Sequence, residues 1–199
     1  MLLMPGVRED TRHRILDSAR RIVASKGYAA VGINEVLGDA KVPKGSFYHF
    51  FESKDAFGRA MLDDYFVEYL AEMDAFLAEP GLTTAQRLMN YWASWYDNQS
   101  FNDCQGKCLA VKLGAEVADL SEPMRLSLEA GTGEIINRLE SAITAGVGDG
   151  SVTVVNDPRA TAQMLYDMWM GASVMAKIRR DRVHFDTSLT ATRQLLHIA

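Results

Sequence analysis

Apolar residues recur every three or four positions along most of this chain, and the strict alternation of half-buried strands is scarce. The first such segment begins at Thr11 and is expected to end at Gly27, which suits the left-handed conformation that terminates helices. Its apolar positions share one helical face: Ile15, Leu16, Ala19, Ile22 and Val23. Because the same period continues to the chain's end, the pattern predicts an all-α protein of about nine helices without internal repeats.

Prolines, glycines and capping residues divide the chain into the expected helices. Ser53 is expected to cap a long helix that ends at Glu79-Pro80-Gly81, and Thr83 or Thr84 to cap the next one. The polar stretch from Asn98 to Lys107 is expected to be a loop. Further helices are expected over 108–119, 121–145, 157–180 and 186–198, opened by Cys108, Ser121, Asp157 and Asp186.

Residues 33–51 are predicted to form a helix-turn-helix. Two short helical segments, 33–37 and 44–50, flank a turn in which Pro43 forces Val42 out of the α region and suits the first turn of the next helix. In this architecture the second helix enters the major groove of DNA. Apolar residues are expected to anchor both helices: Val36, Leu37, Ala40, Val42, Phe47 and Phe51.

Several polar residues of this second helix are left exposed by that packing. Lys44 can bond a guanine edge or a phosphate, and Ser46 can serve a base edge or the DNA backbone. Gly45 allows close approach of the protein backbone, and Lys54 lies beside helix N-terminal amides that also suit a phosphate. The predicted DNA-binding residues are Lys44, Gly45, Ser46, Tyr48, His49 and Lys54.

The run KGSFYHFFESK, from Lys44 to Lys54, resembles the signature of TetR-family transcriptional regulators. The first helix, ending in Lys26-Gly27-Tyr28, is similar to that family's first helix. The resemblance implies a homodimeric repressor of double-stranded operator DNA, with Tyr48 and His49 as phosphate contacts.

Two residues depart from the family pattern. The turn usually reads Ala-Gly-Val and here reads AKV, so Lys41 stands at the glycine position. The second family helix usually begins with Thr or Ser, and here Gly32 takes that place. Gly still caps acceptably, but a hydroxyl contact to DNA is lost.

The domain organisation follows from the motif and the resemblance. Residues 1–53 are predicted to be the helix-turn-helix DNA-binding domain, and 54–199 a helical ligand-sensing and dimerisation domain. By the resemblance, the last two long helices, 157–180 and 186–198, would form a four-helix interface between two copies. The core of a monomer explains their apolar content equally well.

The charge is unevenly distributed, which fits a polyanion partner at one end. Residues 1–60 hold ten Lys and Arg against seven Asp and Glu, whereas the remainder holds 11 against 19. A basic N-terminal segment on an acidic body suggests nucleic acid binding confined to that segment.

The composition excludes several other classes of protein. With 48% hydrophobic and 24% charged residues, the chain is neither disordered nor fibrous. No stretch approaches 18 consecutive apolar residues, and no signal-peptide core follows Met1 to Gly6, so neither a membrane partner nor secretion is expected. Two cysteines are too few for a disulfide scaffold and fit a cytoplasmic protein.

Cys108 is the main candidate for a sensor. It is expected at a helix N-terminus, where amide dipoles favour the thiolate, and Lys107 and Lys112 would lower its pKa further if oriented toward the sulfur. The stretch CLAVKLGAEVADLSE from Cys108 is similar to the TetR branch that controls N-ethylmaleimide reductase genes. This resemblance implies a sensor of reactive electrophiles or oxidants. Cys104, as a resolving thiol, and Lys177 are further sensor candidates.

Other interpretations of the same residues stay open. A small hydrophobic effector could instead bind reversibly among aromatic and methionine side chains, which are more often simply core: Tyr91, Trp92, Trp95, Tyr96, Met124, Met164 and Trp169. An enzyme or interaction module with a non-functional helix-turn-helix is the remaining alternative, but no catalytic pair or nucleotide loop supports it. No cofactor and no metal site are expected, because the two cysteines and four scattered histidines form no ligand set by spacing.

Overall fold

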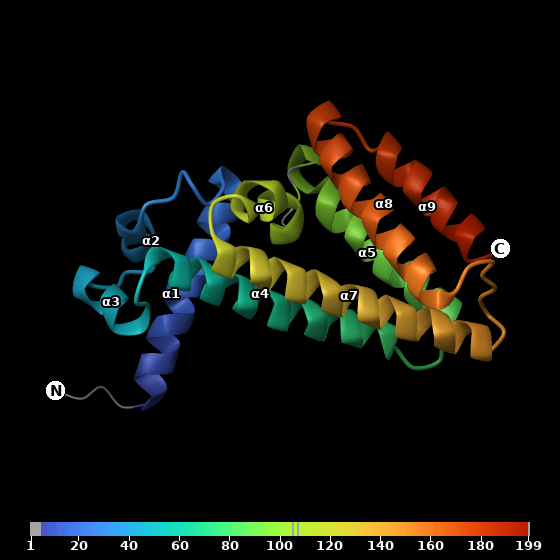
Figure 1. The fold of residues 1–199 in the computed structure, drawn as a ribbon, viewed down its shortest axis with the longest axis horizontal. Helices are drawn as coiled ribbons and strands as arrows, with labels where there is room; N and C mark the ends of the chain where they lie inside the picture. Colours follow the sequence, from blue (N-terminus) through green and yellow to red (C-terminus); the bar gives the residue numbers. More distant parts are fainter. Residues whose placement is uncertain (1–4, 105, 107, 199) are drawn as a thin grey trace. The chain divides into compact units, whose positions relative to one another are not determined.

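The computed structural model describes residues 5–104, 106 and 108–198, without the side chains of 5–9 and 102–104. Over this part of the chain the structure is helical and contains no β-strand, which confirms the all-α prediction (Figure 1). The helices are α1 (Pro5–Lys26), α2 (Ile33–Asp39), α3 (Phe47–Phe50), α4 (Lys54–Leu77), α5 (Thr84–Cys104), α6 (Leu109–Ala118), α7 (Glu122–Gly148), α8 (Pro158–Arg179) and α9 (Val183–Leu195), with a 3-10 turn at Lys44–Ser46.

The chain packs as two compact units. One comprises Met1–Val67 and Lys112–Gly131, and the other comprises Glu68–Val111 and Thr132–Ala199. The predicted boundary between residues 53 and 54 divides the chain by function, and it stays a prediction. None of the described helices is long and apolar enough to cross a membrane.

The first unit is held together by α1, which packs against α2 (Figure 1). An aromatic cluster beside α3 holds it together as well. Phe47, Phe51 and Phe57 form this cluster, with ring centroids 5.0–5.3 Å apart. All the anchoring residues predicted for the helix-turn-helix are buried: Val36, Leu37, Ala40, Val42, Phe47 and Phe51.

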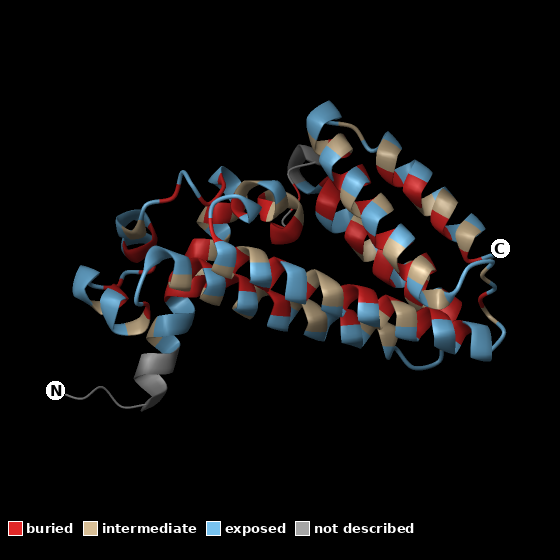
Figure 2. Ribbon diagram, in the orientation of Figure 1, coloured by how far each residue is buried: buried red, intermediate tan, exposed pale blue. Residues whose placement is uncertain are grey.

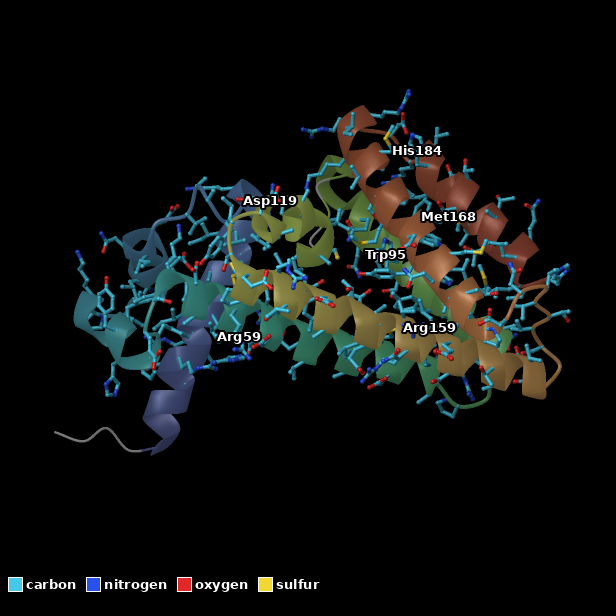
Figure 3. The ribbon with its side chains drawn as sticks, viewed as in Figure 1. Arg59, Trp95, Asp119, Arg159, Met168 and His184 are labelled. Atoms are coloured by element: carbon cyan, nitrogen blue, oxygen red, sulfur yellow. The ribbon has the colours of Figure 1, made fainter. Side chains whose placement is uncertain are left out.

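The second unit is built around α8, which packs against both α5 and α9. Buried residues recur along α8 at helical spacing (Figure 2). Trp169 of α8 stacks on Trp92 of α5 with ring centroids 4.9 Å apart, and its indole N–H donates to Thr192 of α9. Trp95 of α5 lies beside α8 and donates its indole N–H to Ser173 at 3.0 Å (Figure 3). These buried indole hydrogen bonds fix how the three helices pack.

Several helix ends are where the sequence predicts them. Gly27 ends α1 with φ +85°, and Ser53 caps α4 by accepting from the N–H of Ala56 at 3.0 Å. Thr83 opens α5 with a capping box, in which its hydroxyl accepts from the Gln86 N–H and the Gln86 side chain accepts from the Thr83 N–H. Asp157 caps α8 by accepting from the N–H of Ala160.

Other boundaries differ from the sequence expectation. The predicted loop from Asn98 begins as helix, because α5 continues to Cys104, and its polar residues Gln99 and Ser100 are buried rather than solvated. The predicted helix over 44–50 is split, since its first turn is 3-10 and only Phe47–Phe50 is α-helical. The last helix begins at Val183, three residues before the predicted start.

The predicted cap of α7 is correct in position but not in chemistry. Ser121 directly precedes the helix, and its carbonyl accepts from the N–H of Arg125 at 2.9 Å. Its side-chain hydroxyl is buried and has no hydrogen-bond partner in the described structure. The expected side-chain cap is therefore absent from the described contacts.

Candidate functional site

The turn of the helix-turn-helix is a Schellman motif with a lysine where glycine is usual. The N–H of Val42 donates to the Leu37 carbonyl and the N–H of Lys41 to the Gly38 carbonyl, which closes the end of α2. Lys41 adopts φ +55°, in the left-handed region. The Arg14 guanidinium of α1 donates to the carbonyl of Ala40 at 3.1 Å. The turn thus keeps its geometry despite a side chain at the glycine position.

Within residues 44–50, the aromatic residue Phe47 packs into the core, and most of the polar residues are exposed to solvent. Phe47 is fully buried, whereas Tyr48 is 69% exposed. Lys44, Gly45 and His49 are exposed as well, and Ser46 is half-buried. A methyl group built on Gly45 would meet no protein atom within 4 Å, so the space in front of this backbone is open. The predicted DNA-binding residues of this segment are therefore accessible to solvent, Ser46 in part, and their contact with DNA stays a prediction.

Lys54 is held at the start of α4 by Tyr28. The Tyr28 hydroxyl donates to the Lys54 carbonyl, and the Lys54 ammonium lies 5.0 Å from the centre of the Tyr28 ring, within cation–π range. Burial raises the pKa of Tyr28 well above its ordinary value, so the phenol stays a donor. The Lys54 side chain is exposed and available to a phosphate.

A polar contact fixes α2 on α1. The buried hydroxyl of Ser18 and the guanidinium of Arg21 both donate to the carboxylate of Asp39, the latter at 2.6 Å. These two hydrogen bonds, that of Ser18 first, hold the pKa of Asp39 below its ordinary value. The contact sets the angle at which the first helix of the motif meets α1.

Cys108 directly precedes α6, as predicted, and is 7% exposed. It lines a cavity of about 40 Å³. The cavity wall comes from α4, α5 and the residue before α6: Tyr69, Glu72, Met73, Phe76, Tyr91, Ser94, Trp95, Asn98, Gln99 and Cys108. Of the aromatic residues considered for an effector pocket, Tyr91 and Trp95 belong to this wall.

Two phenols, those of Tyr69 and Tyr91, line the same cavity as the thiol. The hydroxyls of Tyr69 and Tyr91 are 2.8 Å apart and share a hydrogen bond. Burial raises the pKa of Tyr91 and of Tyr166 far above their ordinary values, and the charge of a Cys108 thiolate raises both further. Sequence reasoning missed Tyr69 and Tyr166, because no local pattern distinguishes a tyrosine beside a thiol from an ordinary core aromatic.

Lys112 and Glu116, one turn apart on α6, bind the C-terminal end of α1. The ammonium of Lys112 donates to the Ser25 carbonyl at 3.1 Å, and the Glu116 carboxylate accepts from the N–H of Ala29 at 2.7 Å. Gly27 lies between these contacts, and a methyl group there would come within 2.7 Å of the carboxylate. Lys112 is thus engaged with α1, and its predicted effect on the thiol stays a prediction.

Of the remaining sensor candidates, Lys177 and Cys104, the structure describes only the Lys177 side chain. Lys177 lies half-buried in the last turn of α8. Cys104 ends α5, but its side chain lies outside the described residues, and so does Lys107. The pairing of any of these groups with Cys108 stays a prediction.

Comparisons with known proteins define the class. Residues 15–61 match the family described as bacterial regulatory proteins, tetR family, and residues 84–192 match the tetracyclin repressor-like C-terminal domain. The chain belongs to the TetR family and is a DNA-binding transcriptional repressor, in a family that is not enzymatic.

Individual relatives cover nearly the whole chain. The HTH-type transcriptional repressor NemR of Escherichia coli (strain K12) is 34% identical over 94% of each chain. The repressor DhaR of Mycobacterium sp. (strain GP1) is 29% identical over 95% of this chain and 93% of its own. The crystal structure of the reduced form of E. coli NemR superposes with a TM-score of 0.89 at 35% identity, covering 94% of this chain and 97% of that one.

Proposed function

We propose that this repressor releases its operator when Cys108 reacts covalently with a small electrophile or oxidant. The observation that carries the proposal is the thiol's place at the wall of a small cavity, directly before the helix that contacts α1. E. coli NemR, which is similar over most of its length, was solved in a reduced form, and this supports a redox-active thiol in such repressors.

The size of the cavity favours a reactive molecule over a reversible effector. Pockets for drug-sized ligands span roughly 300–1,000 Å³, whereas this cavity holds about 40 Å³. So small a space gives little apolar contact for reversible affinity, but a covalent bond needs little contact. A reversibly bound hydrophobic effector stays the alternative, and it requires the cavity to expand.

In this proposal, α6 transmits the conformational change from the thiol to the DNA-binding segment. Cys108 precedes the first residue of α6, and Lys112 and Glu116 of the same helix hold the end of α1. An adduct on the sulfur would shift the start of α6. We expect this shift to disturb the contacts to Ser25 and Ala29, and with them the helix-turn-helix that α1 supports.

At the DNA end, we propose that the exposed face of residues 44–49 and Lys54 contacts the operator. Lys44 and Ser46 would read base edges or phosphates, Gly45 would admit the DNA backbone closely, and Tyr48 would join His49 at phosphates. Phosphate contacts of this kind make affinity fall steeply with salt. Loss of all salt-dependent binding in the unmodified protein would favour a non-functional motif.

The test measures operator affinity by fluorescence anisotropy, on a duplex selected from a random pool, before and after treatment with N-ethylmaleimide. We expect wild type and Cys104→Ser to lose at least about tenfold in affinity, and Cys108→Ser to stay within about twofold. Release of treated Cys108→Ser, or undiminished binding by fully alkylated wild type, would contradict the proposal.

A further inference from the structure

Tyr166 of α8 carries a buried hydroxyl to which no described residue forms a hydrogen bond. The side chain is 4% exposed, and its hydroxyl has no hydrogen-bond partner in the described structure. Buried polar groups are almost always paired, so an unpaired one is an exception that calls for an explanation. Its ring packs edge-on against Trp95, with centroids 5.8 Å apart, and Trp95 lines the Cys108 cavity.

The neighbouring phenol differs in this respect. Tyr91 lines the same cavity, but its hydroxyl is 2.8 Å from that of Tyr69 and is engaged there. Burial raises the pKa of both Tyr91 and Tyr166, and the charge of a Cys108 thiolate raises both further. Both phenols therefore stay protonated at neutral pH, and Tyr166 has its O–H available to donate.

We propose that Cys108 attacks an α,β-unsaturated carbonyl compound and that the Tyr166 hydroxyl donates a hydrogen bond to the carbonyl oxygen of that compound. This inference rests on the proposed function. The site would then be specific for conjugate acceptors, and not merely for any reagent that reacts with thiols.

The addition balances without any further reactant except water. The Cys108 thiol first loses its proton to solvent, and the thiolate forms a bond from Sγ to the β-carbon. The π electrons of the C=C bond move to the carbonyl oxygen, which becomes an enolate oxygen and accepts the hydrogen bond from Tyr166. The α-carbon then takes a proton from water and the carbonyl is restored, so that S–H has added across the double bond.

A donor placed this way acts on one reaction class more than another. In a conjugate addition, negative charge develops on the carbonyl oxygen, and a fixed donor in a water-poor site stabilises it. In substitution by iodoacetamide, the charge leaves with iodide and the carbonyl oxygen gains none. Loss of the donor should therefore slow the first reaction and spare the second.

The experiment compares Cys108 alkylation rates in a Cys104→Ser background by mass spectrometry, for Tyr166→Phe and the matched control Tyr91→Phe. We expect Tyr166→Phe to slow N-ethylmaleimide at least about tenfold while iodoacetamide stays within about twofold. We expect Tyr91→Phe to slow neither reagent by more than about threefold. A pH–rate profile for iodoacetamide reports the thiol pKa in each variant.

Two outcomes would overturn the role of Tyr166. An unchanged maleimide rate would show that the hydroxyl is not used, and equal slowing with both reagents would show a general effect on the thiol. Operator affinity of fully alkylated wild type is measured in parallel. Retained affinity there would refute the sensing function itself, a result distinct from either rate outcome.

Discussion

Lys41 occupies a backbone conformation that costs most residues free energy. At φ +55° its Cβ is crowded by the following carbonyl, a strain of roughly 1–2 kcal/mol that glycine avoids. We expect Lys41→Gly to raise the free energy of unfolding by about 0.5–1 kcal/mol, since glycine's greater unfolded-state entropy offsets part of the gain. Urea unfolding checks this. Lys41→Ala keeps the Cβ, so an equal gain from that variant would contradict the explanation.

The Asp39 carboxylate makes the packing of α2 depend on pH. Its pKa is lowered by the hydrogen bonds from Ser18 and Arg21, so the ionised form stabilises the fold. This contribution is fully present above the unfolded-state pKa of about 3.9 and is lost as pH falls through the lower folded-state value. We expect Asp39→Asn to be destabilising at pH 7, with a difference from wild type that shrinks below about pH 4. A pH-independent difference in urea unfolding would contradict it.

The sequence alone predicts the burial of some residues but not the contacts between distant ones. The burial of Phe47 and the exposure of Tyr48 follow from helical spacing, and both were predictable. The bond between Ser18 and Asp39 was not, because the two lie on different helices and only tertiary packing brings them together. The Tyr166 hydroxyl, which has no partner among the described residues, is likewise a property of the folded core.

The segment after the turn, residues 44–50, packs against the aromatic cluster through Phe47 and has open space beside Gly45. Gly45 has a negative φ, and a methyl group on it would meet no protein atom within 4 Å. We expect Gly45→Ala to leave unfolding stability unchanged or raise it by up to about 0.5 kcal/mol. Operator affinity should fall at least about tenfold, because the methyl group would occupy the space that the DNA backbone needs. Unchanged affinity would show that this backbone does not approach DNA.

Element boundaries were predictable where a local hydrogen bond sets them. Ser53 and Asp157 cap their helices with their own side chains, so residue type and position suffice. The sequence predicts a loop for the C-terminal part of α5, because a polar stretch is usually solvated. Gln99 and Ser100 are buried in the folded unit, and burial of polar residues depends on partners far away in sequence.

The outer face of α8 bears on the assembly of the whole molecule. Leu165 and Trp169 are buried, whereas Met164, Val174 and Ile178 are exposed by 44%, 43% and 68%. A monomer core would account for the first pair but not for the exposed stripe. The stripe supports the proposed homodimer, in which a second copy would cover this face.

We expect Ile178→Glu to convert the dimer to a monomer and to weaken operator binding at least about tenfold. The two helix-turn-helix segments are then no longer linked, so they cannot bind both operator half-sites as one unit. Analytical ultracentrifugation and anisotropy measure the two effects. Val67→Glu is the matched control, because Val67 of α4 is equally exposed at 70% and lies outside the stripe. A dimeric Ile178→Glu variant would place the interface elsewhere.

In the proposed function, one covalent bond at Cys108 causes the release of the bound operator. The most direct measurement follows the protein–operator complex after addition of N-ethylmaleimide, with the fraction of alkylated Cys108 and the fraction of released DNA determined in the same samples. We expect the two fractions to rise together at one rate in wild type and Cys104→Ser, and neither to rise in Cys108→Ser. Complete alkylation of Cys108 with the operator still bound would contradict it.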